Sequence, residues 1–190
     1  MAQKKKAGDS KSVYQIKVTL KGIKPPIWRR IQVTSDVTLH KLHRILQVVM
    51  GWDDYHLHQF TIGWEHYGTP DPDYSPDFMD DKKTKLHSVV RTEKMKFRYE
   101  YDFGDGWEHE ILVEKIFPAE EGGLYPVCVK GKRACPPEDV GGIWGYAEFL
   151  EAIQNPEHPE HESMMEWAGD DFHPEAFDLD AVNGMLMRMQ

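Results

Sequence analysis

Apolar and polar side chains alternate without a break over residues 95–103 (MKFRYEYDF), and this pattern restricts the folds open to the chain more than any other. Side chains of a strand point to opposite faces at every second residue, so the alternation predicts a strand with one buried face. Gly104-Asp105-Gly106 follows and is typical of a tight turn. Residues 107–117 (WEHEILVEKIF) are predicted to return as the antiparallel partner.

Residues 13–51 predict a hairpin followed by a helix. Residues 13–20 and 27–33 both alternate, with Lys-Pro-Pro between them as a turn. Thr38 is expected to cap a helix over residues 39–50, whose leucines recur at helical spacing. Gly51 is a natural end for that helix.

The remaining chain predicts one further strand, a long loop and helices. Residues 57–64 are expected to be a strand with His58, Phe60, Ile62 and Trp64 on one face. Residues 65–83 hold three prolines and five aspartates and predict a long loop that is either a lid or a plain connection. A short hairpin is expected at 127–135. Helices are expected at 146–153, 163–167 and 182–189.

These elements predict a single α+β domain over residues 13–190, after a flexible basic tail over residues 1–12. The order of strands, helix, strands and then helices favours a largely antiparallel sheet with helices packed against it and a helical C-terminal part.

The net charge of −9 is unevenly distributed. Residues 1–50 hold 11 Lys or Arg against 2 Asp or Glu, whereas residues 51–190 hold 12 against 30. Phosphate contacts need clustered Lys and Arg, so nucleic-acid binding is not favoured, although a basic N-terminal face remains an alternative. The other interpretation is that the basic start lies against the acidic C-terminal end of the same molecule.

Several patterns bear on location. No apolar run approaches the roughly 20 residues of a membrane helix, and no apolar stretch follows the basic start as in a secretory signal. Cys128 and Cys135 do not make a disulfide framework. We therefore expect a cytoplasmic protein with reduced thiols and no membrane partner.

The turn around Gly104 gathers the first set of candidate site residues: Asp102, Asp105, Trp107 and His109. Carboxylates beside a histidine can perform acid–base chemistry or bind a cation. The alternative is ordinary hairpin chemistry, with His109 sharing the buried face of Trp107.

A second set is the pair His56 and His58. On a strand, residues two apart face the same way, so both imidazoles could reach one metal ion, with His109 or a carboxylate as third ligand. The alternative is simple packing at the junction of helix and strand. Cys128 and Cys135 are too far apart in sequence for a usual zinc pair, and buried, unreactive thiols are the default.

Two further sets complete the candidates. Glu138 and Asp139 in the sequence PPEDVGG are ligands, a general base or, as we favour, caps at the start of the next helix. Trp28 and Arg30, with Arg29 between them, could stack on bases or hold phosphate, but adjacent residues of a strand point to opposite faces.

Six segments taken together resemble the plasmid pRiA4b open-reading-frame-three-like family. They are PPIWRR (25–30), residues 39–60, YDFGDGWEH (101–109), ACPPEDVGG (134–142), GYAEFL (145–150) and DDFHPEAFDL (170–179). The resemblance implies a bacterial or archaeal protein that is sometimes encoded near mobile elements or beside a DNA-binding module. Some members carry a resolvase label, but no recombinase signature occurs here. Relatives often have a further cysteine where this chain has Val140.

From these patterns the best hypothesis is a cytoplasmic, non-catalytic binding domain for a protein or small molecule, with no cofactor and no committed metal ligand. A metal-dependent hydrolase or nuclease is the first alternative. A nucleic-acid-binding accessory protein that uses the basic N-terminal strands is the second.

Overall fold

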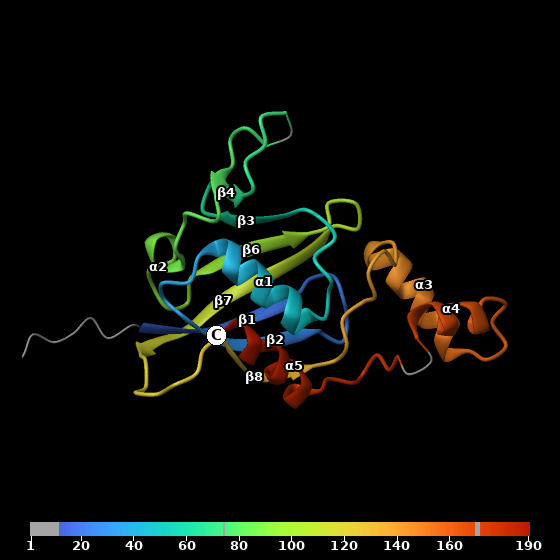
Figure 1. Ribbon diagram of the computed structural model, residues 1–190. Coiled ribbons are helices and arrows are strands. Elements are labelled where there is room, and N and C mark those ends of the chain that lie inside the picture. The colour runs from blue at the N-terminus through green and yellow to red at the C-terminus, as the bar shows by residue number, and fades with distance from the viewer. Residues whose placement is uncertain (1–11, 74, 170–171) are drawn as a thin grey trace, which may run out of the picture.

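The computed structural model describes residues 12–73, 75–169 and 172–190. Its strands form one eight-stranded, mostly antiparallel sheet in the order β5-β4-β3-β6-β7-β1-β2-β8, with helices beside it (Figure 1). The predicted α+β class, with its largely antiparallel sheet, is therefore confirmed. Of the tail predicted over residues 1–12, residues 1–11 lie outside the described residues, and Ser12 begins the first strand.

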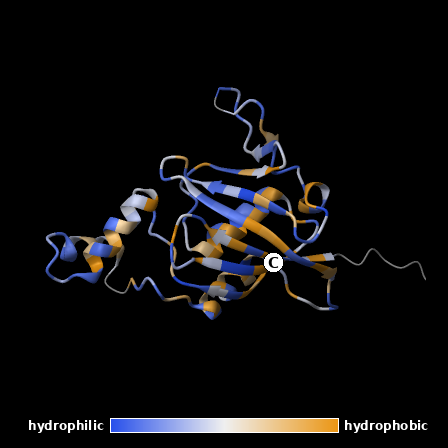
Figure 2. Ribbon diagram, turned by 180° about the vertical axis from the view of Figure 1, so that it is seen from behind, coloured by the Kyte–Doolittle hydropathy of each residue, from blue (hydrophilic) through white to orange (hydrophobic). Residues whose placement is uncertain are grey.

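The two predicted hairpins form the centre of the sheet. The first joins β1 (Ser12–Leu20) to β2 (Trp28–Thr34), and the second joins β6 (Lys96–Tyr101) to β7 (Trp107–Pro118). A pairing of β1 with β7 connects them. Hydrophilic and hydrophobic segments alternate along these strands in Figure 2, as a sheet buried on one face requires.

Helix α1 (Leu39–Met50) lies across one face of this sheet (Figure 1). It begins as predicted, because Thr38 Oγ1 accepts a hydrogen bond from the Lys41 backbone N–H at 3.1 Å. It ends as predicted at Gly51, whose φ of 88° is left-handed. The core between helix and sheet includes Leu42, Leu46, Ile16, Ile31, Tyr99 and Trp107.

The far edge of the sheet differs from the prediction. The third strand, β3 (His58–Ile62), is shorter than expected, because Gly63 turns with φ 65° and leaves Trp64 97% exposed. The expected loop over residues 65–83 contains two short strands, β4 (Glu65–Gly68), which pairs with β3, and β5 (Met79–Asp80), which forms the edge. Similarly, β6 stops at Tyr101, and Phe103 is 46% exposed instead of facing the core.

The connection after β5 contains the short helix α2 (Leu86–Val89). At the opposite edge, β8 (Val127–Lys132) pairs with β2, so the short hairpin expected at 127–135 does not form.

The C-terminal part is helical, as predicted. It contains α3 (Gly142–Gln154), α4 (His161–Ala168), α5 (Leu179–Leu186) and a 3₁₀ turn at Met187–Met189. Asn183 holds α5 against β8 through bonds to both the N–H and the carbonyl of Cys128, at 2.8 and 2.9 Å. No helix in the described part of the chain has the length and apolar character needed to span a bilayer.

Candidate functional site

Three loops meet at one end of the sheet: residues 51–57 after α1, the β6–β7 turn at 102–106, and residues 133–141 before α3. Hydrogen bonds join them. The Asp102 N–H donates to the Leu57 carbonyl at 2.9 Å, and the Asp53 N–H donates to Glu138 Oε1 at 2.8 Å. The Gly141 N–H donates to Asp105 Oδ2 at 3.1 Å. The three loops are therefore held together as one unit.

Each of these loops contributes at least one ionisable side chain to a shared point. His56 Nε2 lies 3.0 Å from Asp139 Oδ1, 3.7 Å from Asp102 Oδ2 and 3.9 Å from Glu138 Oε2. We call His56, Asp102, Glu138 and Asp139 the loop site. The structure thus brings together four of the residues that the sequence singled out, from positions 83 residues apart in the chain.

The backbone of the loop site is strained at two of its carboxylates. Asp102 has φ 55° and Asp139 has φ 57°, a left-handed conformation that costs a non-glycine residue on the order of 1 kcal/mol. The Asp102 Oδ1 atom accepts the N–H groups of Gly104 and Asp105 at 2.9 and 3.3 Å. Its other oxygen is therefore the one that faces His56.

Tyr101 holds Glu138 in place. Its hydroxyl donates to Glu138 Oε1 at 3.0 Å and accepts the Tyr55 N–H at 3.0 Å. Burial and then the neighbouring Glu138 carboxylate raise the pKa of Tyr101, so the phenol stays a neutral donor at physiological pH. Tyr101 was not a candidate site residue in the sequence analysis, because the alternation over residues 95–103 placed it on the buried face of the strand.

The helix-capping role predicted for Glu138 and Asp139 is wrong. The N-cap of helix α3 is Gly141, which has no side chain to cap the helix, and its N–H donates to Asp105 from another loop. A Cβ atom on Gly142 would lie 2.5 Å from the Asp105 carbonyl oxygen, so only glycine permits this close approach. Asp105 thereby positions the loop that carries Glu138 and Asp139.

The charge of the loop site is not balanced by the protein. Among the described residues, neither Lys nor Arg lies within 4.0 Å of the three carboxylates, and His56 is their one ion-pair partner. Carboxylates this close repel one another unless a cation or a proton intervenes. Carboxylate oxygens with one imidazole suit a hard or borderline divalent ion.

A cleft adjoins the loop site between α3 and α4. It measures about 370 Å³, and Asp139 forms part of its wall. The wall also contains Val140, Phe149, Met164 and Trp167, together with Glu148 and Glu160. A molecule in this cleft would meet an apolar surface, acidic groups and one carboxylate of the loop site.

His58 and His109 do not join the loop site. His58 is the first residue of β3, whereas His56 precedes the strand, so the expectation that both face one metal ion is wrong. His58 Nε2 instead lies 2.9 Å from Asp81 Oδ2, in a polar cluster beside the first turns of α1. His40 and His43 of α1 lie beside it, and sequence reasoning missed them although they recur at helical spacing.

His109 and Trp107 belong to the core. Both are fully buried on β7, and neither the two ring nitrogens of His109 nor Trp107 Nε1 has a hydrogen-bond partner among the described residues. Burial lowers the pKa of His109 to about 4, which keeps the ring neutral at physiological pH.

The basic residues of β2 are already engaged. Arg30 donates to both oxygens of Glu114 on β7, at 2.6 and 2.8 Å, and its guanidinium lies 5.3 Å from the Trp28 ring. Arg29 is buried and donates to the Val49 carbonyl at 2.7 Å. The predicted pairing of this region with the acidic C-terminal helices is wrong for Arg30, since its partner Glu114 lies on β7, with β1 between the two strands.

The two cysteines are free and buried, and neither belongs to the loop site. Cys135 Sγ accepts a bond from Arg29 Nη2 at 3.3 Å, and burial raises the pKa of this thiol to about 11. Burial likewise raises the pKa of Cys128. Neither thiol is set up as a nucleophile or metal ligand.

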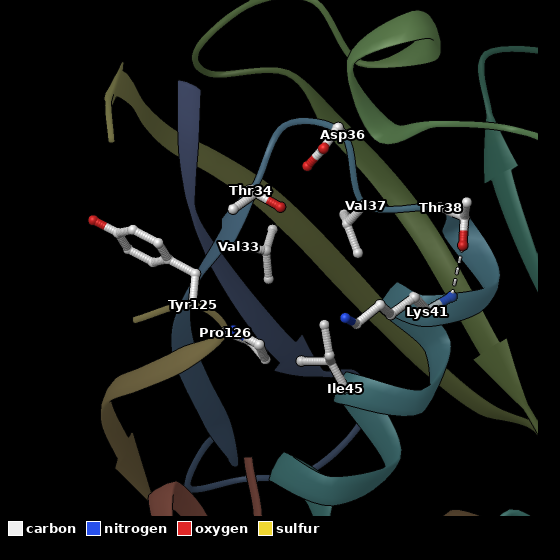
Figure 3. Close-up of a pocket in the computed structure, with 9 residues that line it drawn as sticks. All are labelled: Val33, Thr34, Asp36, Val37, Thr38, Lys41, Ile45, Tyr125 and Pro126. Atoms are coloured by element: carbon white, nitrogen blue, oxygen red, sulfur yellow. Dashed lines mark hydrogen bonds between the residues drawn. The ribbon is translucent and has the colours of Figure 1, made fainter. Parts of the chain in front are cut away.

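A further cavity of about 330 Å³ lies between the start of α1, the end of β2 and Pro126 (Figure 3). Its lining mixes aliphatic side chains with polar ones, and its charged members are Asp36 and Lys41. Its chemistry is less specific than that of the loop site.

Comparison with known proteins identifies the family of this chain, and the matching proteins have no assigned activity. The model of the family described as "Plasmid pRiA4b ORF-3-like protein" matches residues 12–181. The uncharacterized protein y4hQ of Sinorhizobium fredii (strain NBRC 101917 / NGR234) is 43% identical over 159 residues, which cover 83% of this chain and 81% of that protein. The crystal structure of MM3350, a protein of unknown function from Methanosarcina mazei Go1, is similar with 45% identity and a TM-score of 0.82, covering 90% of this chain and 97% of that one.

Proposed function

The chain belongs to the plasmid pRiA4b ORF-3-like family, and from the geometry of its loop site we propose that it is a metal-dependent, non-catalytic binding domain. In this proposal a divalent cation would be held by His56, Asp102 and Asp139, one from each of the three loops, with Glu138 beside it and bound to Tyr101 and the Asp53 N–H. A small ligand occupies the cleft between α3 and α4. We keep the cytoplasmic location expected from the sequence as part of the proposal, and cell fractionation would check it.

The observation that carries this proposal is the approach of three carboxylates to one imidazole nitrogen within 3.9 Å, with neither Lys nor Arg within 4.0 Å of those carboxylates in the described chain. A divalent cation offsets that charge and uses carboxylate oxygens that already lie within 3.9 Å of the imidazole nitrogen. Oxygen-rich sets with one imidazole suit Mn²⁺ better than the thiolate-preferring metals.

The cleft indicates the kind of ligand. Phe149, Met164 and Trp167 favour a molecule with an apolar part, whereas Glu148 and Glu160 disfavour an anionic one. A nucleic-acid backbone therefore fits this wall poorly, and the pairing of Arg30 with Glu114 removes the guanidinium that the sequence offered for phosphate.

The test begins with metal content, measured by plasma mass spectrometry on untagged protein purified without chelator. Mn²⁺ binding is then measured by calorimetry on the chelator-treated and dialysed chain. We expect Asp102→Asn, which keeps the side-chain volume, to weaken Mn²⁺ binding at least about tenfold. His87→Ala, at an exposed histidine of α2, is the matched control and should bind as the wild type does. Equal affinity in Asp102→Asn and wild type would refute the site.

A metal-dependent hydrolase is the second candidate, favoured by the accessibility of the loop site. Asp139 is 67% exposed and lies on the cleft, so a metal-bound water there could meet a substrate. Hydrolysis of bis(p-nitrophenyl) phosphate and p-nitrophenyl acetate by the Mn²⁺-loaded chain separates the two functions. Turnover that disappears in Asp102→Asn would favour the enzyme, and Mn²⁺ binding without turnover of either ester would favour the binding domain.

A further inference from the structure

A second cluster of side chains that can bind a metal ion lies where α1, the start of β3 and the chain after β5 meet. Its residues are separate from those of the loop site. His40 on α1, His58 at the start of β3 and Asp81 after β5 offer ligand atoms that all lie within 4.8 Å of one another. Asp81 Oδ2 is 2.9 Å from His58 Nε2 and 3.4 Å from His40 Nδ1. The three side chains therefore converge on one carboxylate.

Hydrogen bonding within the protein does not satisfy this cluster. Asp81 is 0% exposed, yet its Oδ1 atom has no hydrogen-bond partner among the described residues, and the same holds for His40 Nδ1. A buried carboxylate with an unpartnered oxygen bears a desolvation cost that a single bond to His58 only partly offsets. A cation held by the three groups would engage His40 Nδ1 and supply a counter-charge to the buried Asp81 carboxylate.

The surrounding structure fixes the orientation of the three groups. The His40 N–H donates to the Asp81 carbonyl at 3.2 Å, so the helix start and the chain after β5 are joined at the cluster itself. The His58 ring is stacked on His43 at 3.5 Å between centroids and 5° between planes. His43 is held in turn by Asp54 at 2.7 Å and by the Tyr99 hydroxyl at 2.8 Å.

We propose that His40, His58 and Asp81 form a transition-metal site that binds Zn²⁺. Two imidazoles and one carboxylate are a common set for zinc and for non-haem iron. Zinc–nitrogen bonds of about 2.0–2.1 Å in a tetrahedron place neighbouring ligand atoms about 3.4 Å apart. The His40–Asp81 distance has that value, and the His58–Asp81 contact needs to lengthen by only about 0.5 Å.

A cavity of about 310 Å³ reaches one of the three ligands. His58 lines it together with Leu57, Phe78 and Phe103, whereas His40 and Asp81 do not. His40 is 34% exposed, which gives the ion an approach from solvent. Three protein ligands leave the fourth position of a tetrahedral zinc ion to water or another exogenous ligand.

The experiment titrates Zn²⁺ into chelator-treated and dialysed Asp102→Asn protein, whose loop site has lost a ligand. Calorimetry should show Zn²⁺ binding there, and Co²⁺ in the same protein should give visible d–d absorption. Adding His40→Ala should weaken Zn²⁺ binding at least about tenfold and remove the Co²⁺ band. Adding His87→Ala instead should change neither.

His40→Ala is the principal variant, since the His40 side chain is 34% exposed, whereas Asp81 is fully buried. Asp81→Asn is the second, and far-ultraviolet circular dichroism of each apoprotein establishes that it is folded. Zn²⁺ binding that is absent in the Asp102→Asn protein, or equal with and without His40→Ala, would overturn the proposal. Because the loop site is tested with Mn²⁺ and Asp102, either site can fail without the other.

Discussion

His109 should make the protein acid-labile in a narrow and measurable range of pH. Its imidazole is fully buried, and burial lowers its pKa from 6.5 to about 4. In the unfolded chain the same ring takes up its proton near pH 6.5. Between these two values the unfolded state binds more protons, so the free energy of unfolding falls as the pH falls from about 6.5 towards 4.

The size of the effect follows from the shift. The pKa of His109 differs by about 2.5 units between the unfolded and the folded state, and each unit corresponds to about 1.4 kcal/mol, so the full loss in the free energy of unfolding is about 3 kcal/mol. About 2.5 kcal/mol of this is lost between pH 7 and pH 4.5. Urea denaturation followed by tryptophan fluorescence measures the free energy of unfolding at both pH values. His109→Leu has a similar volume and cannot titrate, so its loss over the same interval should be smaller than that of the wild type by about 2.5 kcal/mol.

The comparison between variants isolates His109 from the other groups that titrate in this range. Burial, with a smaller contribution from His58, also lowers the pKa of His43 to about 4, and this contribution is common to both proteins. His87→Leu, at an exposed site, should retain the full wild-type loss. Parallel losses in the wild type and His109→Leu would show that the buried ring is protonated in the folded state and would refute the reasoning.

Three further outcomes are expected. Tyr99→Phe removes the buried hydroxyl that binds His43 and Gln47, and should lower the free energy of unfolding by about 1–3 kcal/mol in urea. Asp105→Ala leaves the N–H at the N-cap of α3 unpaired, which should cost about 0.5–2 kcal/mol and weaken Mn²⁺ binding; unchanged affinity would mean that Asp105 does not position the loop. Cys128 and Cys135 should react with Ellman's reagent only in denaturant, and rapid reaction of either native thiol would contradict its burial.

The central elements were predictable because their patterns are local. Alternation defined β6 and β7, and Thr38 with Gly51 defined both ends of α1, since strand parity and helix capping depend on residues close in sequence. The predicted lengths of β3 and β6 were wrong because these strands stop early, at Gly63 and after Tyr101. The alternation of apolar and polar residues continues in the sequence after the backbone has turned away.

The amino-acid sequence was enough to identify candidate site residues and the segments that pair with their neighbours in the chain. It identified His56, Asp102, Glu138 and Asp139 as candidates, but it assigned the last two to a helix cap, because their neighbours in sequence favoured that role. The tertiary structure was needed to show that the three carboxylates lie within 3.9 Å of the His56 imidazole nitrogen and that His58 is separate from His56. The physical reason is that the arrangement depends on contacts between loops far apart in the chain, and residue spacing carries no information about these contacts.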